Sequence, residues 1–168
     1  MDVDVNVNDR ELKLRLRLAQ LEKNEFSQNN FIGFVRTVWP DFIAGRHHKI
    51  IAEKLERVAK GELKRLIINM APRHTKSEFA SYLFPAWMMG RNPKMKIIQA
   101  THTTELAVNF GRKTKNLIDS DEYKEIFPAV QLAADSKASG RWDTSKGGMY
   151  YAVGVGSNLA GRGGDLVI

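Results

Sequence analysis

Residues 68–77, INMAPRHTKS, hold the side chains with the clearest potential for chemistry. Lys76 and Ser77 close a short turn after an apolar run, and such a pair ends the phosphate-binding loop G-x-x-x-x-G-K-[ST]. In that loop the lysine contacts the β and γ phosphates of a nucleotide, and the hydroxyl is a ligand of Mg²⁺. Arg73 adds a second cation in reach of a γ-phosphate. The residue types therefore indicate polyphosphate binding.

Both glycines of this pattern are missing, because Met70 and Thr75 stand in their places. Thr75 departs most, since glycine at that position accommodates unusual backbone angles and the close approach of phosphate. The secondary structure expected on either side of the loop favours a nucleotide site more than the match to the sequence pattern does. We expect a buried strand to end at Met70 and a helix to start at Ser77, so that the amides and positive dipole end of the helix face the turn. The alternative is a basic turn between a strand and a helix, without a ligand.

The elements that must position this loop alternate between strand and helix. An apolar run at 66–69 predicts a buried parallel strand, and the spacing of Phe79, Tyr82, Leu83 and Trp87 predicts a helix over 77–89. This rhythm indicates an α/β domain with a mainly parallel sheet flanked by helices. The further elements expected are strands at 96–100, 149–155 and 165–168, helices from Thr103 to about 118 and at 121–126, and a loop at 133–148.

Helices are expected before this domain. Residues 2–8 alternate valine with Asp or Asn and suggest an arm or a short strand, and residues 9–24 favour a helix. Ser27 is a candidate cap for a second helix that stops before Pro40. A third helix, at about 46–60, ends at Gly61. We therefore divide the chain into an N-terminal arm with helices, 1–40, and the α/β domain, 41–168.

The overall charge favours phosphate-bearing partners. The net charge is +7, and residues 46–76 alone carry nine Lys or Arg against three acids. The chain has no cysteine, which excludes disulfides and thiolate metal sites. His47 and His48 have no carboxylate partners at metal-ligand spacing, so no zinc site is expected. The sequence also contains no apolar run of the roughly 20 residues that a membrane span needs.

The segment LIINMAPRHTKSEFASYLFPAW resembles the Walker A region of phage and prophage terminase large subunits, the ATPases that pump DNA into capsids. In that family a Pro-Arg-His stretch, a small residue and Lys-Ser commonly form the loop, and its first glycine is often absent. HHKIIAEKLERVAKGELKRLIINM is similar to the family's lead-in, and KIIQATHTTELAVNFGRKTKNLIDSDEYKEIF to its next strand and helix. RWDTSKGGMYYAVGVGSNLAGRGGDLVI resembles the approach to its Walker B strand. The similarity covers roughly residues 31–168.

The resemblance implies a P-loop NTPase fold of the ASCE type, incomplete here, with ATP and Mg²⁺ as cofactors. It implies catalytic roles for Lys76 and Arg73 and a Mg²⁺ contact from the Ser77 hydroxyl. Candidates for an arginine finger are Arg112, Arg141 and Arg162, and the alternative for each is a plain loop arginine. Arg162 is taken as the catalytic candidate, because its glycine-rich turn permits close approach to a ligand. Trp39 and His48 would lie on the adenine side, and the alternative for the aromatic residues is a core position. The nucleotide-binding residues that the resemblance implies are Pro72, Arg73, His74, Thr75, Lys76 and Ser77.

The partners implied are double-stranded viral DNA, a small terminase subunit and the portal protein, with a homo-oligomeric ring on the portal and no membrane. The location implied is the cytoplasm of the bacterial host and the portal vertex of the procapsid. The catalytic acids of the family follow the DLVI strand, whereas Asp165 precedes it, so we expect a truncated ATPase that binds nucleotide weakly and hydrolyses it poorly. Two alternatives remain: another P-loop nucleic-acid motor such as a helicase, and a non-catalytic remnant that binds DNA or partners through its basic face.

Overall fold

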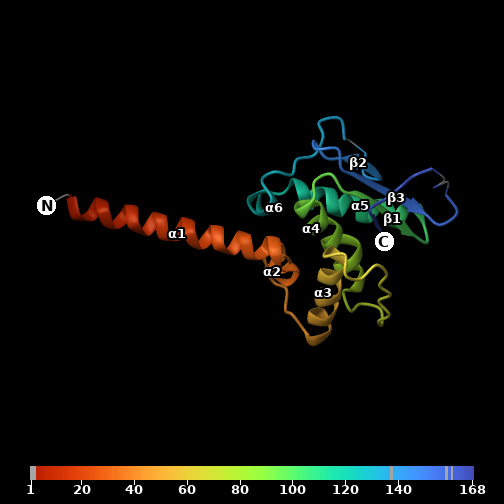
Figure 1. Ribbon diagram of the computed structural model, residues 1–168, viewed down its shortest axis with the longest axis horizontal. Helices are drawn as coiled ribbons and strands as arrows, with labels where there is room; N and C mark the ends of the chain where they lie inside the picture. The colour runs from red at the N-terminus through yellow and green to blue at the C-terminus, as the bar shows by residue number, and fades with distance from the viewer. Residues whose placement is uncertain (1–2, 137, 158, 160) are drawn as a thin grey trace.

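The computed structural model describes residues 3–136, 138–157, 159 and 161–168, with backbone only for 3–7. The chain forms an α/β fold, in which a small mixed sheet is flanked by helices (Figure 1). Among these residues no helix combines the length and the apolar character needed to cross a bilayer. The elements are α1 (Val3–Asn29), α2 (Phe31–Val38), α3 (Arg46–Ala59), η1 (Glu78–Leu83), α4 (Phe84–Arg91), β1 (Lys96–Thr101), α5 (Thr104–Asp119), α6 (Asp121–Ile126), β2 (Arg141–Asp143), β3 (Met149–Gly154) and β4 (Leu166–Val167).

The sheet has the strand order β2-β3-β1-β4. β1 pairs in parallel with both β3 and β4, and Ile97 lies opposite Tyr150 on one side and Leu166 on the other. β2 is antiparallel to β3 and lies in the stretch 133–148 that was expected to be a loop. That expectation was wrong at 141–143, where Trp142 is fully buried and stacks on Tyr150 at 4.9 Å between ring centroids. A three-residue strand with one buried side chain is too short to show the alternation of apolar and polar residues from which a strand is predicted.

Helix α5 packs on the β1–β3 part of the sheet. The Trp142 indole N–H donates to the Gly111 carbonyl at 3.2 Å, and a Cβ at Gly111 would lie 2.5 Å from the Ser139 carbonyl oxygen. Glycine at this position therefore permits the close approach of helix and sheet. The predicted cap of this helix is confirmed, since the Thr103 side chain accepts from the Leu106 N–H.

The N-terminal region is one long helix, so the short strand that residues 2–8 suggested is wrong for residues 3–8. A strand needs a neighbouring backbone for its hydrogen bonds, whereas a helix satisfies its own. Ser27 lies inside α1, and Asn30 is the cap of α2 through its bond from the Gly33 N–H at 2.7 Å. α1 projects away from the rest of the molecule (Figure 1). Its C-terminal part is held by several hydrogen bonds, among them Asn24 to the Glu125 carbonyl at 2.9 Å and the Trp87 N–H to the Ser27 carbonyl at 3.0 Å.

The predicted strand at 66–69 is not formed, and this prediction was wrong. Leu66 and Ile68 pack against the core, whereas the side chain of Ile67 is 93% exposed. A groove of about 890 Å³ lies between residues 60–68 and the edge strand β4, and residues of α3, η1 and α4 also line it. Without an adjacent strand its backbone has no ladder to join, so apolar composition alone does not make it a strand.

The predicted helix after the loop is confirmed, and η1 and α4 form one continuous helix over residues 78–91. Its first six residues have the wider turns of a π-helix, in which the Phe84 N–H bonds to the Phe79 carbonyl. These turns immediately precede Pro85, which has no N–H to donate and whose ring needs space in the preceding turn. Phe79 and Trp87 are fully buried, as the spacing predicted.

Candidate functional site

Residues 71–77 form the loop that leads into this helix, and its backbone donors remain available. The Thr75 carbonyl accepts from the Phe79 N–H at 3.0 Å, so helical hydrogen bonding begins within the loop, at Thr75. Across the described part of the chain, no acceptor takes the amide N–H of Lys76, Ser77 or Glu78. The first amides of a helix lack intrahelical partners and carry partial positive charge, which suits them to an anion.

The backbone of the loop is left-handed at two positions. Arg73 has a φ of 63° and Thr75 a φ of 59°, and they are the non-glycine residues with positive φ in the described ranges. L-residues avoid this conformation because Cβ crowds the following carbonyl, so glycine is the usual occupant. Such turns bring successive N–H groups together into anion-binding concavities. Thr75 thus has the conformation for which the general loop pattern uses glycine.

The side chains of the loop add positive charge. Within the described residues neither Arg73 nor Lys76 is in a salt bridge, and Arg73 is exposed. The Lys76 ammonium has one weak contact, 3.5 Å from the Ala71 carbonyl oxygen. His74 donates from Nδ1 to the Pro72 carbonyl at 2.9 Å, which closes the turn on itself. Both cations are therefore available to a ligand.

Glu78, an acid next to the loop, is paired with a lysine of a neighbouring helix. Glu78 in the first turn of η1 accepts from the Lys113 ammonium of α5 at 2.9 Å. An unpaired carboxylate at this position would repel a phosphate at the loop, and the ion pair offsets that repulsion. Lys113 thus faces an acid of the loop helix.

His48 joins the loop to α3 through a directed chain of hydrogen bonds. The Gly45 N–H donates to His48 Nδ1 at 2.9 Å, so the ring proton is on Nε2. Nε2–H donates to the Thr75 hydroxyl at 2.6 Å, and that hydroxyl donates to the His74 carbonyl at 2.7 Å. The Thr75 hydroxyl therefore both accepts and donates, and it lies in the left-handed turn.

The ring of His48 is buried between two phenylalanines. Its centroid lies 4.8 Å from that of Phe42 and 5.1 Å from that of Phe79, and the residue is 8% exposed. Burial, with a smaller contribution from the charge of His47, lowers the pKa of His48 below its usual value. Trp39 contacts Phe42 on the far side of this cluster, at 5.4 Å. The sequence placed Trp39 and His48 beside an adenine, and the structure brings His48 to the loop with both ring nitrogens engaged.

Two other residues considered from the sequence lie elsewhere. The Arg162 guanidinium is 4.2 Å from the centroid of the Tyr151 ring of β3, and this cation–π contact does not involve the loop. Asp165 accepts from the Lys96 N–H at 2.8 Å, at the end where β1 and β4 begin. This is the end of the strand at which the sequence placed it.

The structure places few metal ligands at the loop. Over the described residues no group of three or more His, Asp or Glu side chains is arranged to hold a metal ion. The exposed Ser77 hydroxyl is one oxygen that a cation bound to phosphate could use. Metal binding here would thus depend mainly on oxygens that a ligand provides.

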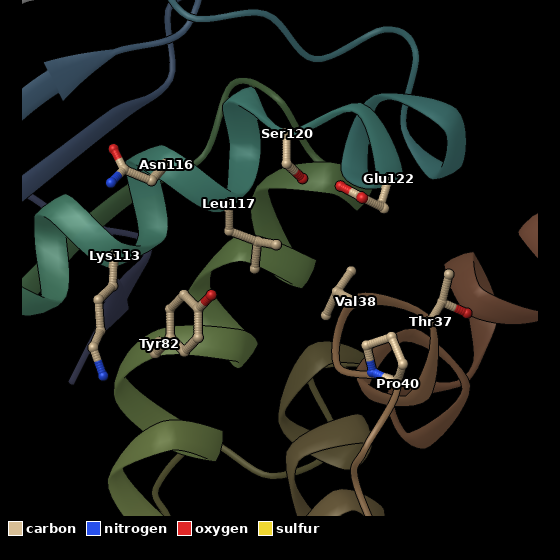
Figure 2. Close-up of a pocket in the computed structure, with 9 residues that line it drawn as sticks. All are labelled: Thr37, Val38, Pro40, Tyr82, Lys113, Asn116, Leu117, Ser120 and Glu122. Carbon is tan, nitrogen blue, oxygen red and sulfur yellow. The ribbon is translucent and has the colours of Figure 1, made fainter.

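A second hollow lies away from the loop, between the end of α2, η1, α5 and α6, with a volume of about 430 Å³. Figure 2 shows the side chains of Leu117 and Val38 directed toward one another across it. Its lysine, Lys113, is the one paired with Glu78. The hollow therefore has no cation free of an internal partner, and it gathers no set of groups comparable to those of the loop.

Comparisons with protein-family models, with curated proteins and with solved structures found no match to this chain.

Proposed function

We propose that residues 71–77 bind the phosphates of ATP. The observation that carries this proposal is the loop backbone: two left-handed residues precede three helix-terminal amides without partners, and Lys76 lies among them. Backbone amides, a helix N-terminus and a lysine are the groups with which proteins hold polyphosphate. The proposed contacts are made by Pro72, Arg73, His74, Thr75, Lys76 and Ser77.

The groups present fit a nucleotide better than they fit a metal ion alone. The amides and two cations match the charge of a triphosphate, whereas the loop provides only the Ser77 hydroxyl for Mg²⁺. We therefore propose that Mg²⁺ enters as the nucleotide complex. Bound in this way, the metal would neutralise phosphate charge, while Lys76 and the amides orient the chain of phosphates.

We further propose that the chain is the ATPase part of a viral DNA-packaging motor, with a P-loop NTPase fold. The support is the resemblance of its ordered segments to terminase large subunits. In that proposal the complete motor couples ATP hydrolysis to the movement of double-stranded DNA into the procapsid in the bacterial cytoplasm. A small terminase subunit, the portal and further copies of the chain in a ring would be its partners, and Arg162 would act toward a neighbouring copy.

Titration with Mg²⁺-ATP by calorimetry tests the binding proposal. Lys76→Ala removes a charge-assisted contact of about 1.5–3 kcal/mol, so the affinity should fall roughly 10- to 100-fold. Lys94→Ala is the matched control, because Lys94 is an exposed lysine in the turn before β1. It should leave the affinity unchanged.

Equal affinities of the Lys76→Ala and Lys94→Ala variants would contradict the proposal, as would wild-type protein that binds no ATP at millimolar concentration. Binding of duplex DNA that is insensitive to both ATP and Lys76→Ala would instead favour the non-catalytic remnant.

A further inference from the structure

We propose that His48 is a positioning residue of the loop: its hydrogen bond to the Thr75 hydroxyl holds Thr75 in the left-handed conformation. Its consequence for phosphate affinity rests on the proposed function. The contact itself does not, because it joins two residues of this chain at 2.6 Å.

Thr75 needs such support because of its Cβ. At a φ of 59° a residue with a side chain is less stable than glycine would be. Its hydroxyl accepts from His48 and donates to the His74 carbonyl at 2.7 Å, so two bonds fix the side chain against the turn. A side chain fixed in this way fixes φ, since rotation of the backbone would break both bonds.

His48 is a rigid donor. It lies in the first turn of α3, where its Nδ1 accepts from the Gly45 N–H and caps that helix. Phe42 and Phe79 enclose the ring and leave it 8% exposed. The capping bond sets the tautomer and the aromatic contacts set the orientation, so Nε2–H is directed at the loop before any ligand binds.

Loss of this bond should change the direction of the amides that follow. Thr75 immediately precedes the three unpartnered amides of residues 76–78, so a change in its backbone angles reorients that group. Alanine at position 75 keeps the Cβ and loses the hydroxyl, whereas glycine needs no hydroxyl to stay left-handed. The affinity for phosphate should thus depend on His48 only while position 75 carries a side chain.

The test measures Mg²⁺-ATP affinity in His48→Ala, Thr75→Ala, Thr75→Gly and the double variant His48→Ala/Thr75→Gly. His48→Ala should weaken binding about tenfold, the loss expected for one hydrogen bond together with release of the left-handed turn. Thr75→Ala should bind about tenfold more weakly than Thr75→Gly. In the Thr75→Gly background, His48→Ala should change the affinity by less than about twofold.

His47→Ala is the matched control. The ring of His47 lies 3.8 Å from that of His48 between centroids, with the two planes tilted by 45°. His47 makes no hydrogen bond to the loop in the described residues, so its loss should leave the affinity unchanged. If His48→Ala weakens binding equally with Thr and with Gly at position 75, the ring acts only through packing and the proposal fails. Equal affinities of Thr75→Ala and Thr75→Gly would overturn it as well.

Urea unfolding of the same variants gives a test without a ligand. The His48→Ala and Thr75→Gly changes should couple by about fivefold in the unfolding equilibrium constant, because packing losses common to both backgrounds cancel in the cycle. A coupling factor of one refutes the positioning role. Coupling in a protein that binds no ATP would refute the proposed function alone.

Discussion

Acidification should destabilise the fold through His48, because the native structure requires its neutral form. Protonation would turn Nδ1 from an acceptor into a donor facing the Gly45 N–H, 2.9 Å away. It would also place a charge between Phe42 and Phe79, beside the ring of His47. The charged and titratable residues on the surrounding segments are Asp41, Arg46, His47, Arg73, His74, Lys76 and Glu78.

The sign follows from the direction of the shift. The native pKa of His48 is lowered from about 6.5, first by burial and then by His47, so the unfolded chain binds a proton more readily. Stability from this residue is therefore complete above about pH 6.5 and is lost as the pH falls through the lowered native pKa. Between these two values one proton is taken up on unfolding, which gives a limiting slope of about 1.4 kcal/mol per pH unit.

Urea unfolding between about pH 7.5 and about pH 5 measures this slope. The free energy of unfolding of wild type should fall more steeply below about pH 6.5 than that of His48→Gln, which cannot take up the proton. His47→Ala should reduce the difference, because loss of the neighbouring charge raises the native pKa of His48. Parallel curves for wild type and His48→Gln would refute the reasoning.

Three substitutions test close tertiary contacts, each by urea unfolding at neutral pH. Gly111→Ala should destabilise by about 1–3 kcal/mol despite the higher helix propensity of alanine, because the new Cβ meets the Ser139 carbonyl at 2.5 Å; a more stable variant would contradict this. Gly148→Ala should cost about 2–3 kcal/mol, since its Cβ would overlap the Pro93 carbonyl, and an unchanged midpoint would argue against that contact. Tyr123→Phe should cost about 1 kcal/mol by removing a buried bond of 2.8 Å to a carbonyl of α4, and no loss would mean that water replaces it.

The elements predicted best are those whose pattern is local. Apolar spacing with a glycine stop predicted the helix at 46–60, which the structure places at Arg46–Ala59, and a threonine cap predicted the start of α5. The strand expected at 96–100 is β1, Lys96–Thr101. Caps and periodicity are properties of consecutive residues, so one sequence is enough to read them.

The elements predicted worst depend on what lies beside them. Residues 66–69 have the composition of a buried strand, yet no strand lies next to them, and Ile67 faces solvent. β2 is short and polar at its ends. It forms because its backbone pairs with β3 at Tyr150 and Tyr151, and because Trp142 stacks on the ring of Tyr150. Composition indicates burial, whereas strand formation also requires a partner backbone, which no local pattern reports.

Thr75, which stands where the general loop pattern has its second glycine, shows why a motif can be misjudged when only its own residues are considered. The general pattern uses glycine at position 75 because a left-handed φ costs other residues stability, and Thr75 has that φ. Here the contact that favours it comes from His48, 27 positions earlier, through α3 and its aromatic cluster. Judged by the pattern of residues 70–77 alone, Thr75 is a mismatch, although a hydrogen bond from the distant His48 stabilises its left-handed backbone. The relevant unit for such a loop is therefore the turn together with the residue that holds it.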